Sequence, residues 1–232
     1  MATLELVTHC WAVRHPHFAQ ALCYQLSSLI LDKPKLCDIA ITVCNDPDDL
    51  LTTEVLSFFM PQLQIKSLVL GAPKLGRRSI GRNYAAKWST ADIVWFVDVD
   101  YVFREGCLDR LANMSWPNDA SIIYPRTIKI QKDFAIGDKS LIASKPALCD
   151  VDPGDFVPHH YSRAIGGVQI VRGDFARQYG YLDGNVRWHK PVDKPFGDTR
   201  EDVPYRKFCQ RHGPMVAIDL PGVYRMRHSF GL

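Results

Sequence analysis

The chain has 232 residues, of which 28 are basic and 25 acidic, and hydrophobic residues make up 47% against 23% charged. This balance is that of a globular protein, and it excludes disorder along the whole chain. The net charge of +3 is too small to predict a nucleic-acid partner or a polybasic membrane anchor. The length suits one large domain or two small ones.

Apolar runs in the sequence are far shorter than the roughly 20 residues that cross a bilayer. The first residues also lack the basic and apolar regions of a signal peptide. We therefore expect a soluble, cytoplasmic protein with no transmembrane segment. The seven cysteines are scattered without a CxxC pair, which favours reduced core side chains over a disulfide framework or a zinc site.

In the first 115 residues, apolar runs alternate with segments of helical periodicity. Strands are expected at 4–12, 39–44, 65–70 and 92–97, and helices at 18–31, 48–60 and 79–88. The alternation predicts an α/β fold with a mostly parallel central sheet flanked by helices. Ligands of such sheets bind at the carboxyl ends of the strands, so we expect the site just after Val97.

The second half of the chain is less regular. One or two strands are expected at 121–130, further strands at 165–172, 215–218 and 223–227, and helices at 174–179 and 201–211. Residues 132–163 lack clear periodicity and are interpreted as a long functional or mobile loop. Because no repeat or linker divides the chain, we predict a single domain over 1–232.

Two carboxylates, Asp98 and Asp100, directly follow the apolar run that ends at Val97. In an extended backbone, side chains two residues apart point the same way, so both anions would face one point. Such a pair repels unless a cation or hydrogen-bond donors lie between the two carboxylates, and hard oxygen ligands suit Mg²⁺ or Mn²⁺ carrying the phosphates of a substrate. The alternative is that the pair only ends the strand and caps the next helix.

Three motif-like segments follow one another along the sequence. They are 81–86 (GRNYAA) with 91–100 (ADIVWFVDVD), then 164–175 with 179–183, then Glu201-Asp202. They resemble the ARN-x-G/A and D-x-D, the GG-R-x-x-F-GG-F-D and the E-D motifs of nucleotide-diphospho-sugar glycosyltransferases with the GT-A fold, especially family 2. The resemblance covers most of residues 4–212. It departs from the family at Tyr181, where Phe is usual, at the single Gly180, and at the first strand, which lacks the usual P-x-Y/F-N turn.

The resemblance implies a GT-A domain in which 1–115 form the nucleotide-binding half and 116–232 the acceptor-side half, with a smaller acceptor-side sheet. It also implies a metal-dependent glycosyltransferase. Such an enzyme would move a sugar from a nucleotide-sugar donor, UDP-linked by expectation, to a hydroxyl of a glycan, lipid or protein acceptor, with inversion.

The same resemblance assigns donor-side roles. Asp100 would hold the metal, and Asp98 would contact the ribose, the metal or a metal-bound water. Arg82 would pair with a phosphate or orient Asp98, although an exposed helix arginine is the alternative. Asp46 would contact the base or the ribose, unless it caps the helix that begins near Pro47. Thr8, with His9, would line the base pocket.

On the acceptor side, the resemblance makes Asp202 the catalytic base and gives Glu201 the acceptor or sugar hydroxyls. The alternative is an acidic first turn that complements the dipole of a helix. Gly166 and Gly167 would let the backbone approach the donor sugar, where any side chain would collide. A plain bend or bulge would also suit these glycines.

Four further residues receive weaker assignments. His228 would complete the metal site, since imidazole can join two aspartates around manganese. His159 and His160, within the expected loop, would serve as lid or acceptor contacts. Trp188 could stack on a sugar face, but packing is its favoured role.

Two other functions stay open from the sequence alone. A sugar-phosphate nucleotidyltransferase would carry a glycine-rich basic loop after the first strand, whereas residues 9–17 contain no glycine and only Arg14 as a basic side chain besides histidines. A non-catalytic, nucleotide-sugar-binding member of the fold would not need the acidic motifs at 98–100 and 201–202.

Overall fold

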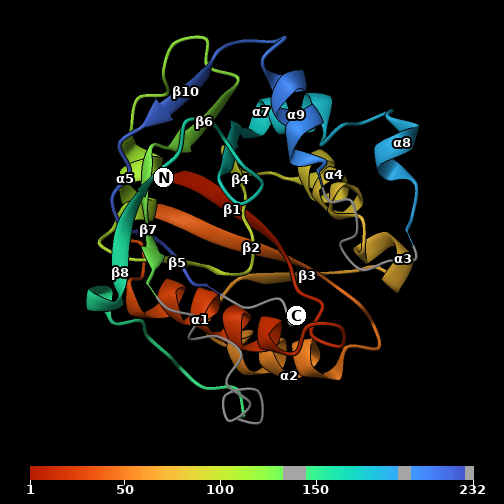
Figure 1. Cartoon of the computed structure of the whole chain (residues 1–232), viewed down its shortest axis with the longest axis vertical. Coiled ribbons are helices and arrows are strands. Elements are labelled where there is room, and N and C mark those ends of the chain that lie inside the picture. Colours follow the sequence, from red (N-terminus) through yellow and green to blue (C-terminus); the bar gives the residue numbers. More distant parts are fainter. Residues whose placement is uncertain (133–144, 193–199, 228–232) are drawn as a thin grey trace.

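The structure is a computed structural model, and it describes residues 1–132, 145–192 and 200–227. Its main sheet consists of β1 (Ala2–His9), β2 (Cys37–Asn45), β3 (Ile65–Val69), β4 (Ile93–Phe96), β6 (Ile122–Pro125), β9 (Gln169–Arg172) and β10 (Met215–Ile218). These seven strands lie in the order β10-β6-β9-β4-β1-β2-β3 (Figure 1). The sheet therefore contains strands from both halves of the chain.

Strand direction in this sheet is mostly parallel. β4, β1, β2 and β3 run parallel to one another, and β10 is parallel to β6. β9 is antiparallel to both of its neighbours, β4 and β6. The predicted mixed α/β fold with a mostly parallel central sheet is thus confirmed.

Most of the helices fall into two groups, and α5 (Cys107–Asn113) lies apart from both (Figure 1). The other described helices are α1 (His17–Leu31), α2 (Leu50–Phe59), α3 (Ala72–Leu75), α4 (Arg78–Trp88), α7 (Gly173–Tyr179), α8 (Val186–His189) and α9 (Asp202–Cys209). Figure 1 shows α1 and α2 side by side at one end, whereas α3, α4, α7, α8 and α9 gather at the other. The apolar stripe predicted for the first helix is buried, with Phe18, Leu22 and Leu26 in the core.

A second, smaller sheet packs beside the first. Its strands are β5 (Tyr101–Phe103), β7 (Thr127–Gln131), β8 (Phe156–His160) and β11 (Val223–Arg225), in the order β5-β11-β7-β8. A short 3-10 turn, Pro153–Asp155, leads into β8. The expectation of a smaller additional sheet is confirmed.

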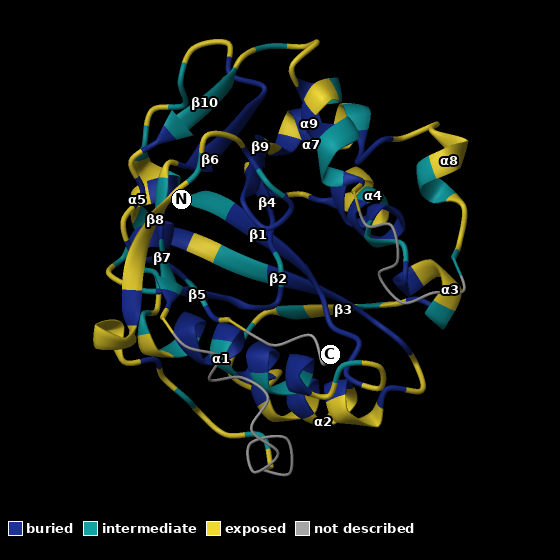
Figure 2. Cartoon of the chain, viewed as in Figure 1, coloured by how far each residue is buried: buried dark blue, intermediate teal, exposed yellow. Residues whose placement is uncertain are grey.

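The core follows the central strands. Every residue of β4 is buried, and Trp95 and Phe96 are completely inaccessible to solvent. Figure 2 shows this burial along β1, β4 and the interior face of α1. An uninterrupted apolar strand such as β4 is stable only when both faces of the sheet are covered, which is the arrangement found here.

Several expected elements need correction. The strand expected at 165–172 begins only at Gln169, because residues 165–168 turn, with Val168 N donating to Ile165 O. The loop expected over 132–163 contains β8, which is antiparallel to β7. β5 and α5 were not expected; β5 is only three residues long, and α5 follows Gly106, whose φ of 67° starts the helix after a left-handed turn.

All seven cysteines are free thiols, and six of them are buried, as expected of reduced core side chains. Among the described residues, no helix is both long and apolar enough to cross a membrane.

Candidate functional site

Three parallel neighbouring strands deliver the predicted donor-side residues to one edge of the main sheet. β1 ends at His9, β2 ends just before Asp46, and β4 ends two residues before Asp98. Because parallel neighbours end at the same edge, these residues are close in space although they are far apart in sequence. The expected location of the site, after the apolar strand, lies at the edge to which β1, β2 and β4 lead.

The tripeptide 98–100 does not continue the strand. β4 ends at Phe96, Val99 and Asp100 lie in a turn, and Tyr101 N donates to Asp98 O over 3.3 Å. The prediction that an extended backbone aligns the two carboxylates is therefore wrong. Each carboxylate is instead held by its own arginine partners.

Asp98 is bound by two arginines of α4. Arg78 Nη1 and Arg82 Nη2 lie 2.8 and 2.9 Å from Asp98 Oδ1. Burial raises the pKa of this carboxyl, but the two guanidinium groups outweigh burial and lower the pKa to about 2. Arg82 is fully buried, so the alternative of an exposed helix arginine is wrong, and its side chain contacts Asp98. Arg78 was not singled out from the sequence.

Asp100 is paired with an arginine from the second sheet. Arg225, the last residue of β11, places its Nε 2.9 Å from Asp100 Oδ2, and Met226 N donates to Asp100 O over 2.9 Å. The Asp100 side chain is only 3% exposed, against 33% for Arg225. The carboxylate of Asp100 raises the pKa of Arg225, so this cation is firmly charged. No motif had pointed to Arg225.

Gly166 lies between the two acidic motifs. A Cβ added to Gly166 would stand 3.7 Å from Asp98 Oδ2 and 3.7 Å from the Cβ of Asp202. The structure therefore brings the predicted donor-side carboxylate and the predicted base close to the same residue without a side chain, and Asp98, Gly166 and Asp202 together form the candidate site. The predicted close approach of a substrate to Gly166 is compatible with this geometry.

Gly167 has a different explanation. A Cβ there would meet the ring of Tyr101, with Cε2 at 2.4 Å, and Gly167 O accepts from Trp95 Nε1 over 3.2 Å. The close neighbour of Gly167 is thus a core tyrosine. Its small size is required by packing between β5 and the turn that precedes β9.

A buried polar chain connects the two acidic motifs. Arg82 Nη1 donates to Tyr181 Oη over 3.2 Å, and Tyr181 Oη donates to Gln169 Oε1 over 2.8 Å. Gln169 Nε2 in turn donates to the backbone oxygen of Asp202 over 3.1 Å. Arg82, Tyr181 and Gln169 are all completely buried. The hydroxyl in this series of hydrogen bonds is present because residue 181 is Tyr, whereas the family that the sequence resembles usually has Phe there.

Glu201 and Asp202 occupy the start of α9 but differ in exposure. Asp202 is half-buried, whereas Glu201 is 1% exposed and its two carboxylate oxygens have no hydrogen-bond partner among the described residues. An unpaired buried acceptor is costly, about 1–3 kcal/mol, unless something supplies donors. The charge of Glu201 also contributes to the raised pKa of Arg82.

The loop after β2 shows which aspartate caps α2. Asp46 Oδ1 accepts from Asp48 N over 3.0 Å, so it stabilises its own turn and is not the helix cap. The cap is Asp49, whose side chain accepts from Thr52 N over 3.0 Å and from Ala12 N over 2.5 Å. The cap expected at Asp46 is therefore three residues too early. Asp49 joins the start of α2 to the segment after β1.

Thr8 and His9 are both buried at the end of β1. Neighbouring residues of a strand face opposite sides of the sheet. His9 faces α4, because a Cβ on Gly81 would lie 2.6 Å from His9 Nε2. Thr8 faces the other side, and its hydroxyl has no hydrogen-bond partner among the described residues.

The remaining predicted residues belong to α8, to β8 and to the end of the chain. Trp188, in α8, is flanked by Arg77 and Arg187, whose guanidinium carbons lie 5.5 and 5.3 Å from its ring centre, in keeping with the favoured packing role. His159 and His160 are exposed residues of β8, not of a loop, and His160 Nδ1 lies 2.8 Å from Thr127 Oγ1. His228 lies outside the described residues.

A divalent ion fits the residues around Asp98 and Asp100 only in part. In the described ranges, no three His, Cys, Asp or Glu side chains gather closely enough to form a complete cation site. Asp98 and Asp100 nevertheless provide hard oxygens, and the hydrogen bonds described for Asp98 leave its Oδ2 facing Gly166. Arg225 beside Asp100 shows that this place accepts a positive charge.

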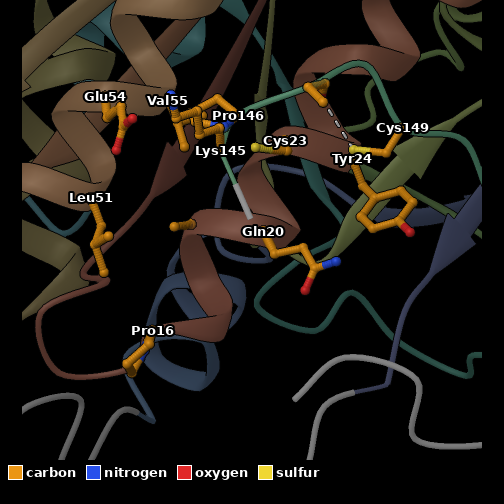
Figure 3. Close-up of a pocket in the computed structure, with 12 residues that line it drawn as sticks. Pro16, Gln20, Cys23, Tyr24, Leu51, Glu54, Val55, Lys145, Pro146 and Cys149 are labelled. Atoms are coloured by element: carbon orange, nitrogen blue, oxygen red, sulfur yellow. Dashed lines mark hydrogen bonds between the residues drawn. The ribbon is translucent and has the colours of Figure 1, made fainter. Parts of the chain in front are cut away.

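A separate cavity of about 140 Å³ lies between α1, α2 and the segment 145–149 (Figure 3). Gln20, Cys23 and Tyr24 of α1 form one wall, and Cys149 lies across from them, with its N–H donating to Ser27 Oγ over 3.0 Å. None of the predicted site residues that the structure describes lines this cavity. The candidate site therefore remains the group formed by Asp98, Gly166 and Asp202.

Comparison with known proteins identifies the family of this chain. The family model "Glycosyl transferase family 2" matches residues 22–180. The structure is similar to that of S. aureus TarS, with a TM-score of 0.62 and 14% identity, covering 98% of this chain and 37% of that one. No curated protein sequence matches.

TarS 1-349 is also similar in its complexes. The complex with UDP gives a TM-score of 0.58 at 15% identity, covering 98% of this chain and 61% of that one. The complex with UDP-GlcNAc gives 0.59 at 14% identity, covering 100% and 60%. The chain thus spans less than two thirds of these structures, and at such identity they show the shared fold. The family match extends over more than half of the chain, and the chain belongs to glycosyl transferase family 2.

Proposed function

We propose that the chain is a glycosyltransferase that moves a sugar from a nucleoside-diphosphate donor to an acceptor hydroxyl, with inversion. One observation carries the proposal: Asp98 Oδ2 and the Cβ of Asp202 both lie 3.7 Å from the position of a Cβ on Gly166. A leaving group held at Asp98 and a base at Asp202 would then act on one substrate bound beside Gly166. The UDP and UDP-GlcNAc complexes of TarS support UDP-GlcNAc as the first donor to test.

The acceptor side supplies the proton acceptor. In a single displacement, the acceptor oxygen bonds to the anomeric carbon, the bond from that carbon to the diphosphate oxygen breaks, and Asp202 takes the hydroxyl proton. Asp202 is the first residue of α9. Glu201, with two buried unpaired oxygens, offers acceptors to hydroxyl groups of the sugar or the acceptor.

The donor side supplies positive charge and fixed geometry. Arg78 and Arg82 hold Asp98, and their guanidinium groups bring positive charge to the place where the diphosphate would lie. Asp98 and Asp100 would hold a divalent ion, which neutralises charge on the departing diphosphate. Asp46 and His9, at the ends of β2 and β1, would line the nucleoside pocket.

The proposal is tested by incubating the purified protein with Mn²⁺ and a panel of nucleotide sugars and measuring released nucleoside diphosphate. Asp202→Asn is expected to reduce release at least about 100-fold, because a general base typically contributes that factor or more. Binding of UDP should stay within about twofold of wild type, since Asp202 contributes to the chemical step. Asp100→Ala should instead weaken metal-dependent UDP binding.

Asp174→Asn is the matched control, because Asp174 is a 66% exposed aspartate in the first turn of another helix. It should retain wild-type release and binding. Equal turnover in wild type and Asp202→Asn would remove Asp202 from the mechanism. A product with retained anomeric configuration, seen by NMR, would refute single displacement, and pyrophosphate release from a nucleoside triphosphate would favour nucleotidyl transfer.

A further inference from the structure

Arg225 occupies the position that a cation bound to Asp100 would need. Its Nε lies 2.9 Å from Asp100 Oδ2, and its guanidinium carbon lies 5.7 Å from the ring centre of Tyr101. β11 fixes this placement, because Arg225 is paired in register with Tyr101 on antiparallel β5. The arginine is therefore aligned by backbone pairing with the residue that directly follows Asp100.

This ion pair meets a physical need of the ligand-free protein. The Asp100 side chain is 3% exposed, and a carboxylate removed from water is strongly unfavourable without a countercharge. Arg225 supplies that charge. A divalent ion bound to the same oxygen would supply it equally well, and the two positive charges would repel each other if both stayed.

The exposure and hydrogen bonding of Arg225 allow its side chain to move away from Asp100. Its side chain is 33% exposed, and the hydrogen bond described to Asp100 uses only Nε. The other N–H groups of a guanidinium form a planar fork that matches phosphate oxygens. A nucleoside diphosphate bound at the candidate site would offer such oxygens.

We propose that Arg225 is an exchangeable counter-ion: it neutralises Asp100 in the ligand-free protein and transfers to the donor's diphosphate when a divalent ion takes Asp100. The proposal rests on the proposed function, because that function places the metal and the diphosphate at the candidate site. It makes Arg225 a residue that couples the two ligands. Metal alone must displace Arg225 without giving it a new partner, whereas metal with nucleotide provides one, so each ligand strengthens binding of the other.

The test is a Mn²⁺ titration of the full chain by electron paramagnetic resonance, with and without UDP. For wild type we expect weak Mn²⁺ binding alone and a gain of at least about tenfold in affinity when UDP is present, in the usual range of coupling. In Arg225→Gln, Mn²⁺ alone should bind at least about tenfold more tightly, and the gain from UDP should fall to about twofold or less. Arg110→Gln, an exposed arginine of α5, is the control and should behave as wild type.

Arg225→Lys guards against loss of folding in the glutamine variant, because it keeps a positive charge near buried Asp100. A lysine lacks the planar fork, so the gain from UDP should fall in this variant as well. Unchanged Mn²⁺ affinity in Arg225→Gln, or an unchanged gain from UDP in Arg225→Lys, would overturn the exchange.

Asp100→Asn separates this proposal from the proposed function. If Asp100→Asn abolishes Mn²⁺ binding while Arg225→Gln leaves it unaltered, the exchange fails and the metal assignment stands. If Mn²⁺ binds equally well to wild type and Asp100→Asn, the metal is not at Asp100. The metal assignment and the exchange would then fail together.

Discussion

Gly166 and Gly167 are adjacent, but a methyl group added to each would meet different surroundings. At Gly166 the nearest atoms are 3.7 Å away and belong to Asp98 and Asp202, whereas at Gly167 the ring of Tyr101 lies at 2.4 Å. The first distance is ordinary van der Waals contact and the second is a clash. The resemblance to the family assigned both glycines one role, and the structure separates them.

We therefore predict opposite effects for two alanine substitutions. Gly166→Ala should leave the free energy of unfolding within about 0.5 kcal/mol of wild type, yet reduce turnover at least about tenfold, because small displacements of a substrate are costly. Gly167→Ala should lower the free energy of unfolding by about 2 kcal/mol through overpacking. Urea unfolding and nucleoside-diphosphate release measure the two quantities. Wild-type turnover in Gly166→Ala would show that substrate does not approach this residue.

The sequence predicted the residues of the site that belong to recognisable motifs, such as Arg82, Asp98 and Asp202. It did not predict Arg225, because that residue meets Asp100 across 125 positions of chain, through strand pairing in the smaller sheet. The hydrogen bond from Gln169 to the backbone of Asp202 could not be predicted from the sequence either, since it depends on the turn before β9. Local patterns indicate which residues come after a strand, but they contain no information about the residues that another sheet places beside it.

At the scale of elements, the donor-side edge depends on how the loops after β1 and β2 are joined. Asp49 is fully buried and accepts hydrogen bonds from Ala12 N, Thr52 N and Thr52 Oγ1. One carboxylate thereby caps α2 and fixes the segment after β1. The position of His9 and of the expected nucleoside pocket depends on this connection.

Asp49→Ala should lower the free energy of unfolding by about 3 kcal/mol, because it removes a helix cap and leaves buried N–H groups without acceptors. Asp48→Ala is the matched control, since Asp48 is an exposed neighbour in the same loop. It should change stability by less than about 0.5 kcal/mol. Chemical denaturation of both variants gives the comparison, and equal stability would show that Asp49 does not join the two loops.

Element prediction succeeded where periodicity was long and failed where elements were short. The helices at 17–31 and 78–88 and the strand at 37–45 lie within two residues of expectation at each end. β8 was not predicted because Pro158 and two histidines give its sequence no strand-like pattern. Its pairing with β7 is also decided by tertiary contact. The bounds of short strands are set by partners that the local sequence does not contain.

At the scale of the whole molecule, the main sheet joins both halves of the chain. β4, from the first half, pairs with β1 on one side and with β9, from the second half, on the other. Separating the halves would expose a fully buried strand edge. We therefore treat the chain as one cooperative unit, in which the protonation of a single buried group influences the free energy of unfolding of the whole.

His9 is such a group. Burial lowers its pKa well below 6.5, and Arg82 and Arg78 lower it further, while Asp98 opposes them; Cys44 also lies close to the ring. The folded protein thus keeps His9 neutral at a pH where the unfolded chain binds a proton. Stability is complete above the ordinary pKa of histidine and falls as the pH decreases below it.

We expect this group to reduce the free energy of unfolding as the pH falls from about 7.5 to about 5, by up to ~1.4 kcal/mol for each pH unit below the ordinary pKa of histidine. Asp98 does not interfere, because its lowered pKa costs stability only as the pH falls below its usual value of 3.8 toward about 2. His9→Gln cannot take up this proton, so urea unfolding at the two pH values should show a loss smaller by that amount. An equal loss in wild type and His9→Gln would mean that His9 is protonated in the folded protein, which the surrounding arginines and the burial of its ring strongly oppose.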